Sequence, residues 1–224
     1  MTKLFYWMGS RPLIPLLIFS AVFTCFWLMQ FKKPLRLTWL KAVALSVAHV
    51  VIGVCAVSLF AFLEDPNGYS FGVQSLFGGV FFMPLVYWAW AKFTKRGYHE
   101  VFDIFAVCMI FTLMCARMNC LFSGCCIGKF IPGTDGLRWP TREAELVFYI
   151  VLLIIYAPKV HKQKTCGEIY PMYMMGYGLF RFVTETFRTG NTLFHLSHLW
   201  ALIAFCIGAG FILEFQSKKG GRIR

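Results

Sequence analysis

Two arginines and a glutamate stand out in a chain that is otherwise very apolar. Arg181 lies inside a long apolar run, and Glu185 and Arg188 follow it at spacings of four and seven residues. These spacings put the three side chains on one face of a helix, and Tyr177 extends that face by one turn. An arginine in the centre of a membrane helix costs about 2.5–3.5 kcal/mol on insertion scales, so it needs an explanation. It either forms a salt bridge between helices or helps to bind an anionic headgroup, since guanidinium groups suit phosphate.

A second arginine site lies beside a group of cysteines, in the stretch CARMNCLFSGCCIGK. Arg117 ends an apolar run there, and Cys120, Cys125 and Cys126 follow it. The set has no C-x-x-C pair and no histidine at ligand spacing, so we expect no metal and no cofactor. One interpretation is a disulfide from Cys120 to Cys125 or Cys126 in an oxidising compartment. The other is a thiolate that acts as base or nucleophile, preferably at Cys125, with its pKa lowered by neighbouring cations.

Other polar residues have simpler explanations. In the segment WPTREAEL, Glu143 falls in the first turn of an expected helix, where the helix dipole accounts for it, whereas Glu145 lies one step deeper and could face a cavity. His49, in the middle of an apolar run, is interpreted as a core histidine. His195 and His198, near a helix end, suit proton transfer but equally suit capping or anchoring.

The chain as a whole is too apolar for a soluble domain of its size. Of its 224 residues, 58% are hydrophobic and only 14% are charged, so lipid must be part of its solvent. The net charge of +12 would suit nucleic acid, but the basic residues cluster on every second connection between apolar runs. That distribution follows the positive-inside rule. We therefore expect a multi-pass membrane protein with no nucleic-acid partner.

Seven apolar segments predict the architecture. They indicate an all-α, polytopic membrane helix bundle of about seven transmembrane helices, in a single domain over residues 1–224. Six spans, with the fifth segment only interfacial, is the alternative. Odd-numbered segments lead into basic connections, which predicts the N-terminus outside and the C-terminus in the cytoplasm. The segments are Arg11–Gln30, Trp39–Phe62, Leu76–Ala91, Val101–Cys115, Arg142–Ala157, Ile169–Phe187 and Ser197–Phe215.

The connections expected on the outer side hold the unusual polar residues. They read EDPNGYSFGVQS, CLFSGCCIGKFIPGTDGLRWPTR and FRTGNTLFHLSH, whereas the inner connections are plain charged turns. A reaction site would therefore face the outer half of the bilayer.

Three blocks of the sequence resemble the phosphatidylglycerol–prolipoprotein diacylglyceryl transferases. The family signature G-R-x-G-N-F-x-N-x-E-x-x-G is similar to ARMNCLFSGCCIG, which keeps Arg117 and Gly128. The family block H-P-x-Q-x-x-E is similar to WPTREAE, which keeps Pro140 and Glu145. The resemblance extends over about Leu76 to Leu213. The third block, Y-G-x-x-R-F-x-x-E-x-x-R, is matched by Tyr177, Gly178, Arg181, Phe182, Glu185 and Arg188.

The departures from the family pattern fall on the residues expected to move protons. The family has a histidine in an S-F-H-G-G-like block where SLFGG here has Phe77. The signature asparagine is replaced by Cys120, and the signature glutamate by Cys125. The resemblance thus implies a phosphate-binding site in which thiols replace the histidine and the carboxylate.

The function implied by the resemblance is lipid transfer in the bacterial plasma (inner) membrane, as part of lipoprotein biogenesis. A group derived from an anionic, phosphatidylglycerol-like phospholipid would move to the cysteine of a lipoprotein precursor or to a small thiol or other acceptor. Two other classes stay open: a non-catalytic lipid-binding protein on the same scaffold, and a membrane thiol–disulfide protein. The expected catalytic residues are Cys125, Cys126 and Glu185, and the expected substrate-binding residues are Arg117, Arg181, Tyr177, Arg188, Glu145 and Gly128.

Overall fold

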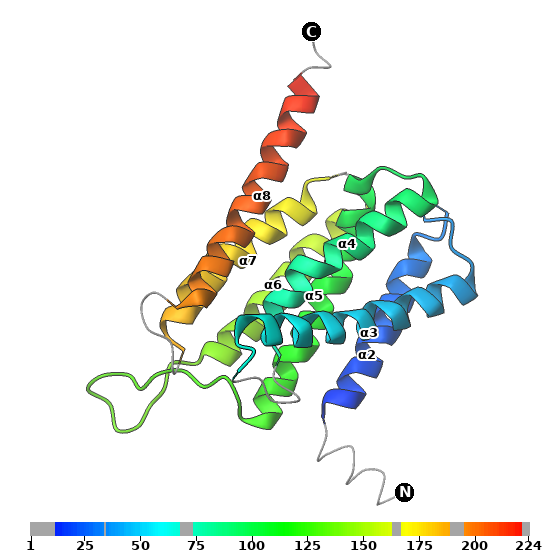
Figure 1. Cartoon of the computed structure of the whole chain (residues 1–224). Coiled ribbons are helices and arrows are strands. Elements are labelled where there is room, and N and C mark those ends of the chain that lie inside the picture. The colour runs from blue at the N-terminus through cyan, green and yellow to red at the C-terminus, as the bar shows by residue number, and fades with distance from the viewer. Residues whose placement is uncertain (1–11, 34, 68–73, 163–166, 189–194, 221–224) are drawn as a thin grey trace, which may run out of the picture.

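The computed structural model describes residues 12–33, 35–67, 74–162, 167–188 and 195–220, and within these ranges the chain folds into seven helices (Figure 1). The described residues form no strand beyond two isolated backbone bridges, so the prediction of an all-α bundle is confirmed. The helices are α2 (Leu13–Gln30), α3 (Trp39–Glu64), α4 (Leu76–Thr94), α5 (Tyr98–Ser123), α6 (Thr141–His161), α7 (Ile169–Thr186) and α8 (Leu196–Gly220).

Six of the seven helices in the described part of the chain are long and apolar enough to cross a membrane. The fifth predicted segment, which became α6, is among them. The helix that falls short is α7, whose 18 residues are less apolar because they combine Arg181 and Glu185 with three tyrosines, two glycines and a proline. The orientation of the termini and the single-domain organisation stay predictions.

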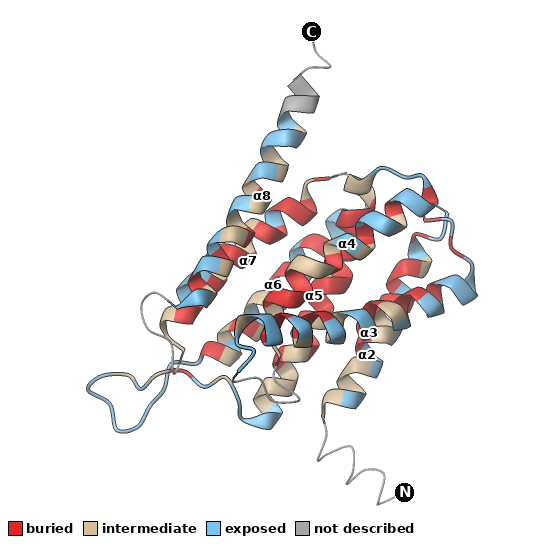
Figure 2. Ribbon diagram, in the orientation of Figure 1, coloured by how far each residue is buried: buried red, intermediate tan, exposed pale blue. Residues whose placement is uncertain are grey.

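Helix α5 lies at the centre of the bundle and α8 at its edge. In the apolar stretch of α5, 78% of the residues are buried, against 22% in that of α8 (Figure 2). Helices α2, α4, α6 and α7 all pack against α5. The exposed side chains of α8 are largely apolar, for example Leu199, Leu202 and Leu213, as expected for a surface covered by lipid.

Glycine and aspartate bring α7 into place. A Cβ at Gly178 would overlap the backbone of α8 at Ala201 and Phe205, so only glycine allows this close approach. At the other end, the carboxylate of Asp103 on α5 accepts hydrogen bonds from the amides of Gly167 (2.6 Å) and Tyr170 (2.9 Å). This carboxylate satisfies amides at the start of α7 that have no partner within the helix.

Helix α5 runs further than the sequence indicated. The expected segment ends at Cys115, but the helix continues to Ser123 and stops at Gly124, whose positive φ of 68° is typical of a helix C-cap. The prediction that Cys120 begins an outer loop was therefore wrong: it lies in the last turn of α5. The expected segment was ended where polar residues begin, but polar residues that point into a protein interior do not end a helix.

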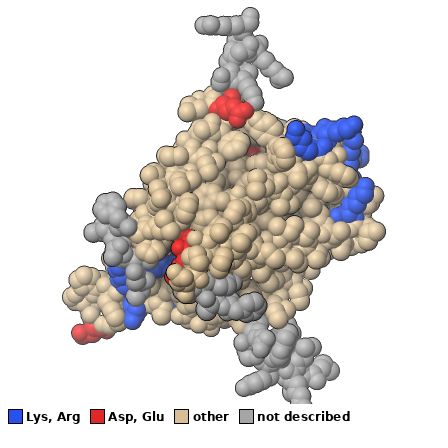
Figure 3. All heavy atoms as spheres, viewed as in Figure 1, with Lys and Arg blue, Asp and Glu red and all other residues tan. Residues whose placement is uncertain are grey.

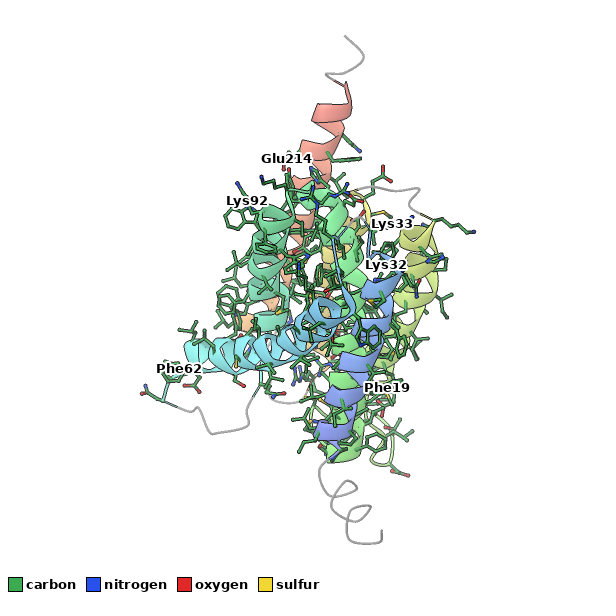
Figure 4. All side chains as sticks on the ribbon, turned by 90° about the vertical axis from the view of Figure 1, so that its right-hand side faces the viewer. Phe19, Lys32, Lys33, Phe62, Lys92 and Glu214 are labelled. Carbon is green, nitrogen blue, oxygen red and sulfur yellow. The ribbon has the colours of Figure 1, made fainter. Side chains whose placement is uncertain are left out.

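Charged side chains gather at the two ends of the bundle, with a broad uncharged band between them (Figure 3). Lys32 and Lys33, after α2, lie towards the same end as Lys92 at the end of α4 (Figure 4). The connection between α5 and α6 lies at the opposite end (Figure 1). The basic connections after α2 and after α4 therefore lie towards one end of the bundle, as the alternation of charge in the sequence predicted.

Candidate functional site

Four charged side chains from three helices form a buried ion-pair chain. Arg117 Nε on α5 lies 2.5 Å from Glu145 Oε2 on α6, and Arg181 Nη1 on α7 lies 2.7 Å from Glu145 Oε1. Arg181 also pairs with Glu185 one turn further along α7. Each of these side chains exposes 3% of its surface or less. One carboxylate therefore holds two arginines that are 64 residues apart in the sequence.

Arg188 extends this chain towards the surface. Its Nη1 lies 3.3 Å from Glu185 Oε1, and its Nη2 donates to Cys126 Sγ at 2.8 Å. The loop after α5 is held there by a backbone bridge between Gly128 and Arg188 and by a hydrogen bond from Lys129 N to Phe187 O (2.8 Å). The end of α7 thus positions the cysteine loop.

The three guanidinium groups line a cavity of about 580 Å³, and their carboxylate partners do not. Arg117, Arg181 and Arg188 all face it, whereas Glu145 and Glu185 lie behind them. Within this ion-pair chain, three cations and two anions leave an excess of one positive charge, while Glu64 and Asp65 line another part of the same cavity. An arrangement in which fixed carboxylates orient guanidinium groups towards an opening suits an anion such as a phosphodiester.

Phe77, which stands where the family has its histidine, also lines this cavity. The Arg181 guanidinium lies over its ring, with Cζ 5.2 Å from the ring centroid. Tyr177 packs edge-on against the other side of Phe77 and does not reach the cavity. Tyr177 is thus a packing residue, and its expected place in the binding set is not supported by its position.

The three thiols that the sequence singled out come together at the cavity. Their sulfur atoms all lie within 4.8 Å of one another, and Cys120 and Cys126 line the cavity while Cys125 is exposed beside it. The contact with the Cys120 thiol, 3.9 Å away, and the charges of Arg188 and Arg117 lower the pKa of Cys126, although burial opposes the shift. Burial raises the pKa of Cys125.

This geometry corrects the preference for Cys125 as the reactive thiol. The sequence placed Cys125 nearest the cations, but Lys129 donates to Thr186 O (2.8 Å) instead, and the arginine contact belongs to Cys126. The correction has a backbone cause: Gly124 (φ 68°) and Cys126 (φ 58°) both take left-handed conformations, which turn Cys126 inward. In this structure all three cysteines are free thiols.

Gly128 and Glu145 support the site without touching the cavity. A Cβ at Gly128 would overlap the carbonyl oxygen of Trp139, so glycine lets the two arms of the loop approach each other. Glu145 orients Arg117 and Arg181, as described above.

The sequence left one cavity residue undecided and missed another. His195 and Ser197, at the start of α8, line the cavity with His195 Nδ1 2.7 Å from Ser197 Oγ. His198 is buried and packs against the ring of Phe182. Nothing in the local sequence distinguishes the two histidines, because only the position of α8 against α7 decides which one faces the cavity.

An apolar cleft adjoins the cavity. The two share Gln74, Leu76 and Ala116, and the cleft continues between α3, α4 and α5. Its deep end contains His49, whose Nε2 lies 3.3 Å from Thr112 Oγ1. The cleft holds about 50 Å³ beside the cavity of about 580 Å³, so in this structure it has room for only the first few groups of an apolar chain attached to a charged head.

These features define a polytopic helical membrane protein with a cavity suited to an anion. The sequence matches the prolipoprotein diacylglyceryl transferase family over residues 15–214, and the chain belongs to this family. The resemblance inferred from the sequence blocks is thereby confirmed.

Relatives of known name are distant. The phosphatidylglycerol–prolipoprotein diacylglyceryl transferase of Pasteurella multocida (strain Pm70) is 30% identical over 141 residues, covering 57% of this chain and 52% of the relative. The enzyme of that name from Polaromonas naphthalenivorans (strain CJ2) is 26% identical over 133 residues, covering 52% and 48%. That of Citrobacter koseri (strain ATCC BAA-895 / CDC 4225-83 / SGSC4696) is 28% identical over 169 residues, covering 59% and 58%. The chain spans about half the length of the curated relatives it matches.

Proposed function

We propose that this protein is a membrane transferase that moves the diacylglyceryl group of an anionic, phosphatidylglycerol-like phospholipid to an acceptor thiol. Family membership supports the reaction class. The observation that carries the proposal is the cavity, which presents three guanidinium groups and continues into an apolar cleft. Phospholipid headgroups would bind in the first part and the start of an acyl chain in the second.

The phosphate would bind to Arg117, Arg181 and Arg188. One phosphodiester carries one negative charge, which matches the excess positive charge of the ion-pair chain. Glu145 and Glu185 act as positioning residues, because both lie behind the arginines and neither faces the cavity. This assigns to Glu185, which the sequence placed among the catalytic residues, a role in orienting Arg181 and Arg188.

The reaction would proceed by displacement at the glycerol carbon that carries the phosphate oxygen. The acceptor thiol loses its proton, its sulfur forms a bond to that carbon, and the carbon–oxygen bond breaks. The electron pair leaves with the phosphate, whose additional negative charge the arginines stabilise. The product is a thioether and a free phosphate monoester.

The proton of the acceptor would pass to His195, whose ring lines the cavity. Cys126 lines the same cavity, but the hydrogen bond from Arg188 stabilises its thiolate and so makes it a weaker base, which leaves it the second candidate. A nucleophilic role of Cys126 is less consistent with chemistry, because its attack on the lipid would leave a stable thioether on the protein.

The test is a transfer assay with purified protein in detergent. Phosphatidylglycerol labelled in its acyl chains would be offered together with a peptide containing a lipoprotein-type cysteine or, in a parallel reaction, with a small thiol. We expect labelled thioether in at least one reaction, and loss of at least tenfold in rate for His195→Gln but not for the exposed Cys55→Ser control.

Two outcomes would contradict the proposal. Binding of phosphatidylglycerol without transfer to either acceptor would assign the protein to the non-catalytic lipid-binding class. A Cys120–Cys126 disulfide that exchanges with added dithiols, without lipid transfer, would assign it to the thiol–disulfide class. Equal rates for His195→Gln and wild type, together with loss in Cys126→Ser, would move the base to Cys126.

We propose further that the protein lies in the bacterial plasma (inner) membrane with the cavity at the outer face. The support is the grouping of Lys32, Lys33 and Lys92 towards the end of the bundle opposite the cysteine loop (Figures 1 and 4).

A further inference from the structure

The cysteine cluster has a geometry that lipid transfer does not require. Cys120 Sγ and Cys126 Sγ lie 3.9 Å apart, and Cys125 Sγ completes a triangle in which no two sulfur atoms are more than 4.8 Å apart. A single base would need only one of these thiols. Three converging sulfurs are the donor set of a thiophilic metal ion.

We propose that Cys120, Cys125 and Cys126 bind one soft divalent metal ion of the Zn²⁺ class through three thiolates. Zinc–sulfur bonds are about 2.3 Å long, so three sulfurs around one tetrahedral ion lie about 3.8 Å apart. The observed separation of Cys120 and Cys126 agrees with this spacing. The third sulfur reaches it by a movement of about 1 Å, which is within the range of a cysteine rotamer change.

Charge also favours three thiolates in this place. Arg188 Nη2 lies 2.8 Å from Cys126 Sγ, and Arg117 Nη1 lies 3.9 Å from Cys120 Sγ. These guanidinium groups would hydrogen-bond to the ligand sulfurs from outside the coordination sphere, as groups around metal sites commonly do. Three thiolates and one divalent ion have a net charge of −1, so the arginines are attracted to the loaded site.

The cluster is open to an entering ion. Cys125 is exposed, and Cys120 and Cys126 are partly exposed on the cavity side. Three protein ligands leave the fourth tetrahedral position for water or a small ligand from the cavity. The sequence has no C-x-x-C spacing, and for that reason we expected no zinc site. The spacing is not required, because the last turn of α5 and the left-handed turn at Gly124 bring the sulfurs together.

Metal binding leaves His195, the proposed proton acceptor, free, because the three thiols alone would hold the ion. The inference does not rest on the proposed function: the ion would bind whether or not the protein transfers lipid.

The test is a titration of the full chain in detergent with CdCl₂ under a reducing phosphine, with MgCl₂ as the hard-ion control. We expect a thiolate-to-cadmium charge-transfer band in the near ultraviolet that saturates at one equivalent, and none with magnesium. Cys126→Ser and Cys120→Ser should weaken binding by roughly 100-fold, whereas Cys55→Ser, which removes an exposed cysteine on α3, should bind as wild type does. A band of unchanged size and affinity in both cluster variants, or no saturable band in wild type, would overturn the proposal.

A measurement on the wild-type protein keeps the proposal testable if the variants do not fold. One equivalent of Zn²⁺ should slow alkylation of Cys126 by at least tenfold, as read by peptide mass, and a chelator should restore the rate. Alkylation at the same rate with and without Zn²⁺ would show that the three thiols hold no ion.

Discussion

The ion-pair chain and the cysteine cluster lie side by side but are built in opposite ways. Arg117, Glu145 and Arg181 lie on helices and are almost fully buried, whereas Cys125 and Cys126 lie on a loop that follows the end of α5. Buried charges in an apolar protein must have fixed partners, since an unpaired one is costly. Thiols tolerate exposure and gain reactivity from it. The comparison indicates that the first region contributes stability, whereas the second contributes reactive thiols.

The strongest test of this comparison removes the carboxylate shared by two arginines. In Glu145→Gln, Arg117 and Arg181 lose their common anion in a buried place, and we expect the free energy of unfolding to fall by about 3–5 kcal/mol. Glu143→Gln is the matched control on the same helix, because Glu143 is exposed and, within the described part of the chain, forms an ion pair with Arg142 alone, at 3.4 Å. It should change stability by less than about 1 kcal/mol.

Thermal or denaturant unfolding in detergent would measure both variants. Equal stability of Glu145→Gln and Glu143→Gln would mean that the buried network does not stabilise the bundle.

A second test concerns the geometry of the arginines and not only their charge. Lysine keeps the charge but loses the planar fork, so Arg181→Lys should lose about 1.5–3 kcal/mol of phosphatidylglycerol binding. Native mass spectrometry with phosphatidylglycerol, and with zwitterionic phosphatidylcholine as control, would measure it. Unchanged binding by a folded Arg181→Lys protein and by Arg181→Ala would reduce Arg181 to a salt-bridge residue.

A third test compares two adjacent thiols by their pH dependence. The pKa of Cys126 is lowered by its contact with Cys120 and by the charges of Arg188 and Arg117, and that of Cys125 is raised by burial. The thiolate fraction of Cys126 should therefore saturate at a lower pH than that of Cys125, and its alkylation rate should vary less with pH across the neutral range. The rate at Cys125 should rise about tenfold per pH unit below its pKa.

Peptide mass spectrometry after brief exposure to iodoacetamide separates the two sites. At pH 6, Cys126 should be modified at least ten times faster than Cys125. Arg188→Gln should reduce that ratio, because it removes the 2.8 Å contact to Cys126 Sγ. The reverse preference, with Cys125 faster at pH 6, would restore the expectation from the sequence.

The smallest expected effect lies in the loop backbone. Gly124 has φ 68° and open space around its Cα, so Gly124→Ala should cost about 1–2 kcal/mol from conformation alone. Gly97→Ala is the control, because Gly97 precedes α5 with φ −60° and equally open space. If Gly124→Ala also weakens Cd²⁺ binding, the turn positions the thiols. Unfolding and metal titration on one preparation would report both quantities.

The spacing of Arg181, Glu185 and Arg188 in the sequence indicated that their side chains meet, and the structure joins them through Glu185. Arg181 and Glu185 lie on α7, whereas Arg188 lies just beyond its end. The prediction of Cys125 as the reactive thiol was not supported, because the direction of a side chain in a loop depends on φ and ψ values that sequence spacing does not reveal. The end of the fourth apolar segment was misplaced for a related reason, since Arg117 and Cys120 were judged by polarity and not by what surrounds them.

The sequence by itself determined that the protein is a helical membrane protein of this family, because apolar length, basic connections and motif blocks are properties of the chain read in order. Only the tertiary structure decided which charges pair and which face the cavity. Glu145 on α6 meets Arg117 on α5 and Arg181 on α7 because helix packing sets those distances, with α7 held close to α8 at Gly178. The same packing directs the guanidinium groups of the arginines into the cavity and keeps their carboxylate partners out of it. It also places Cys126 at the cavity, in contact with Arg188.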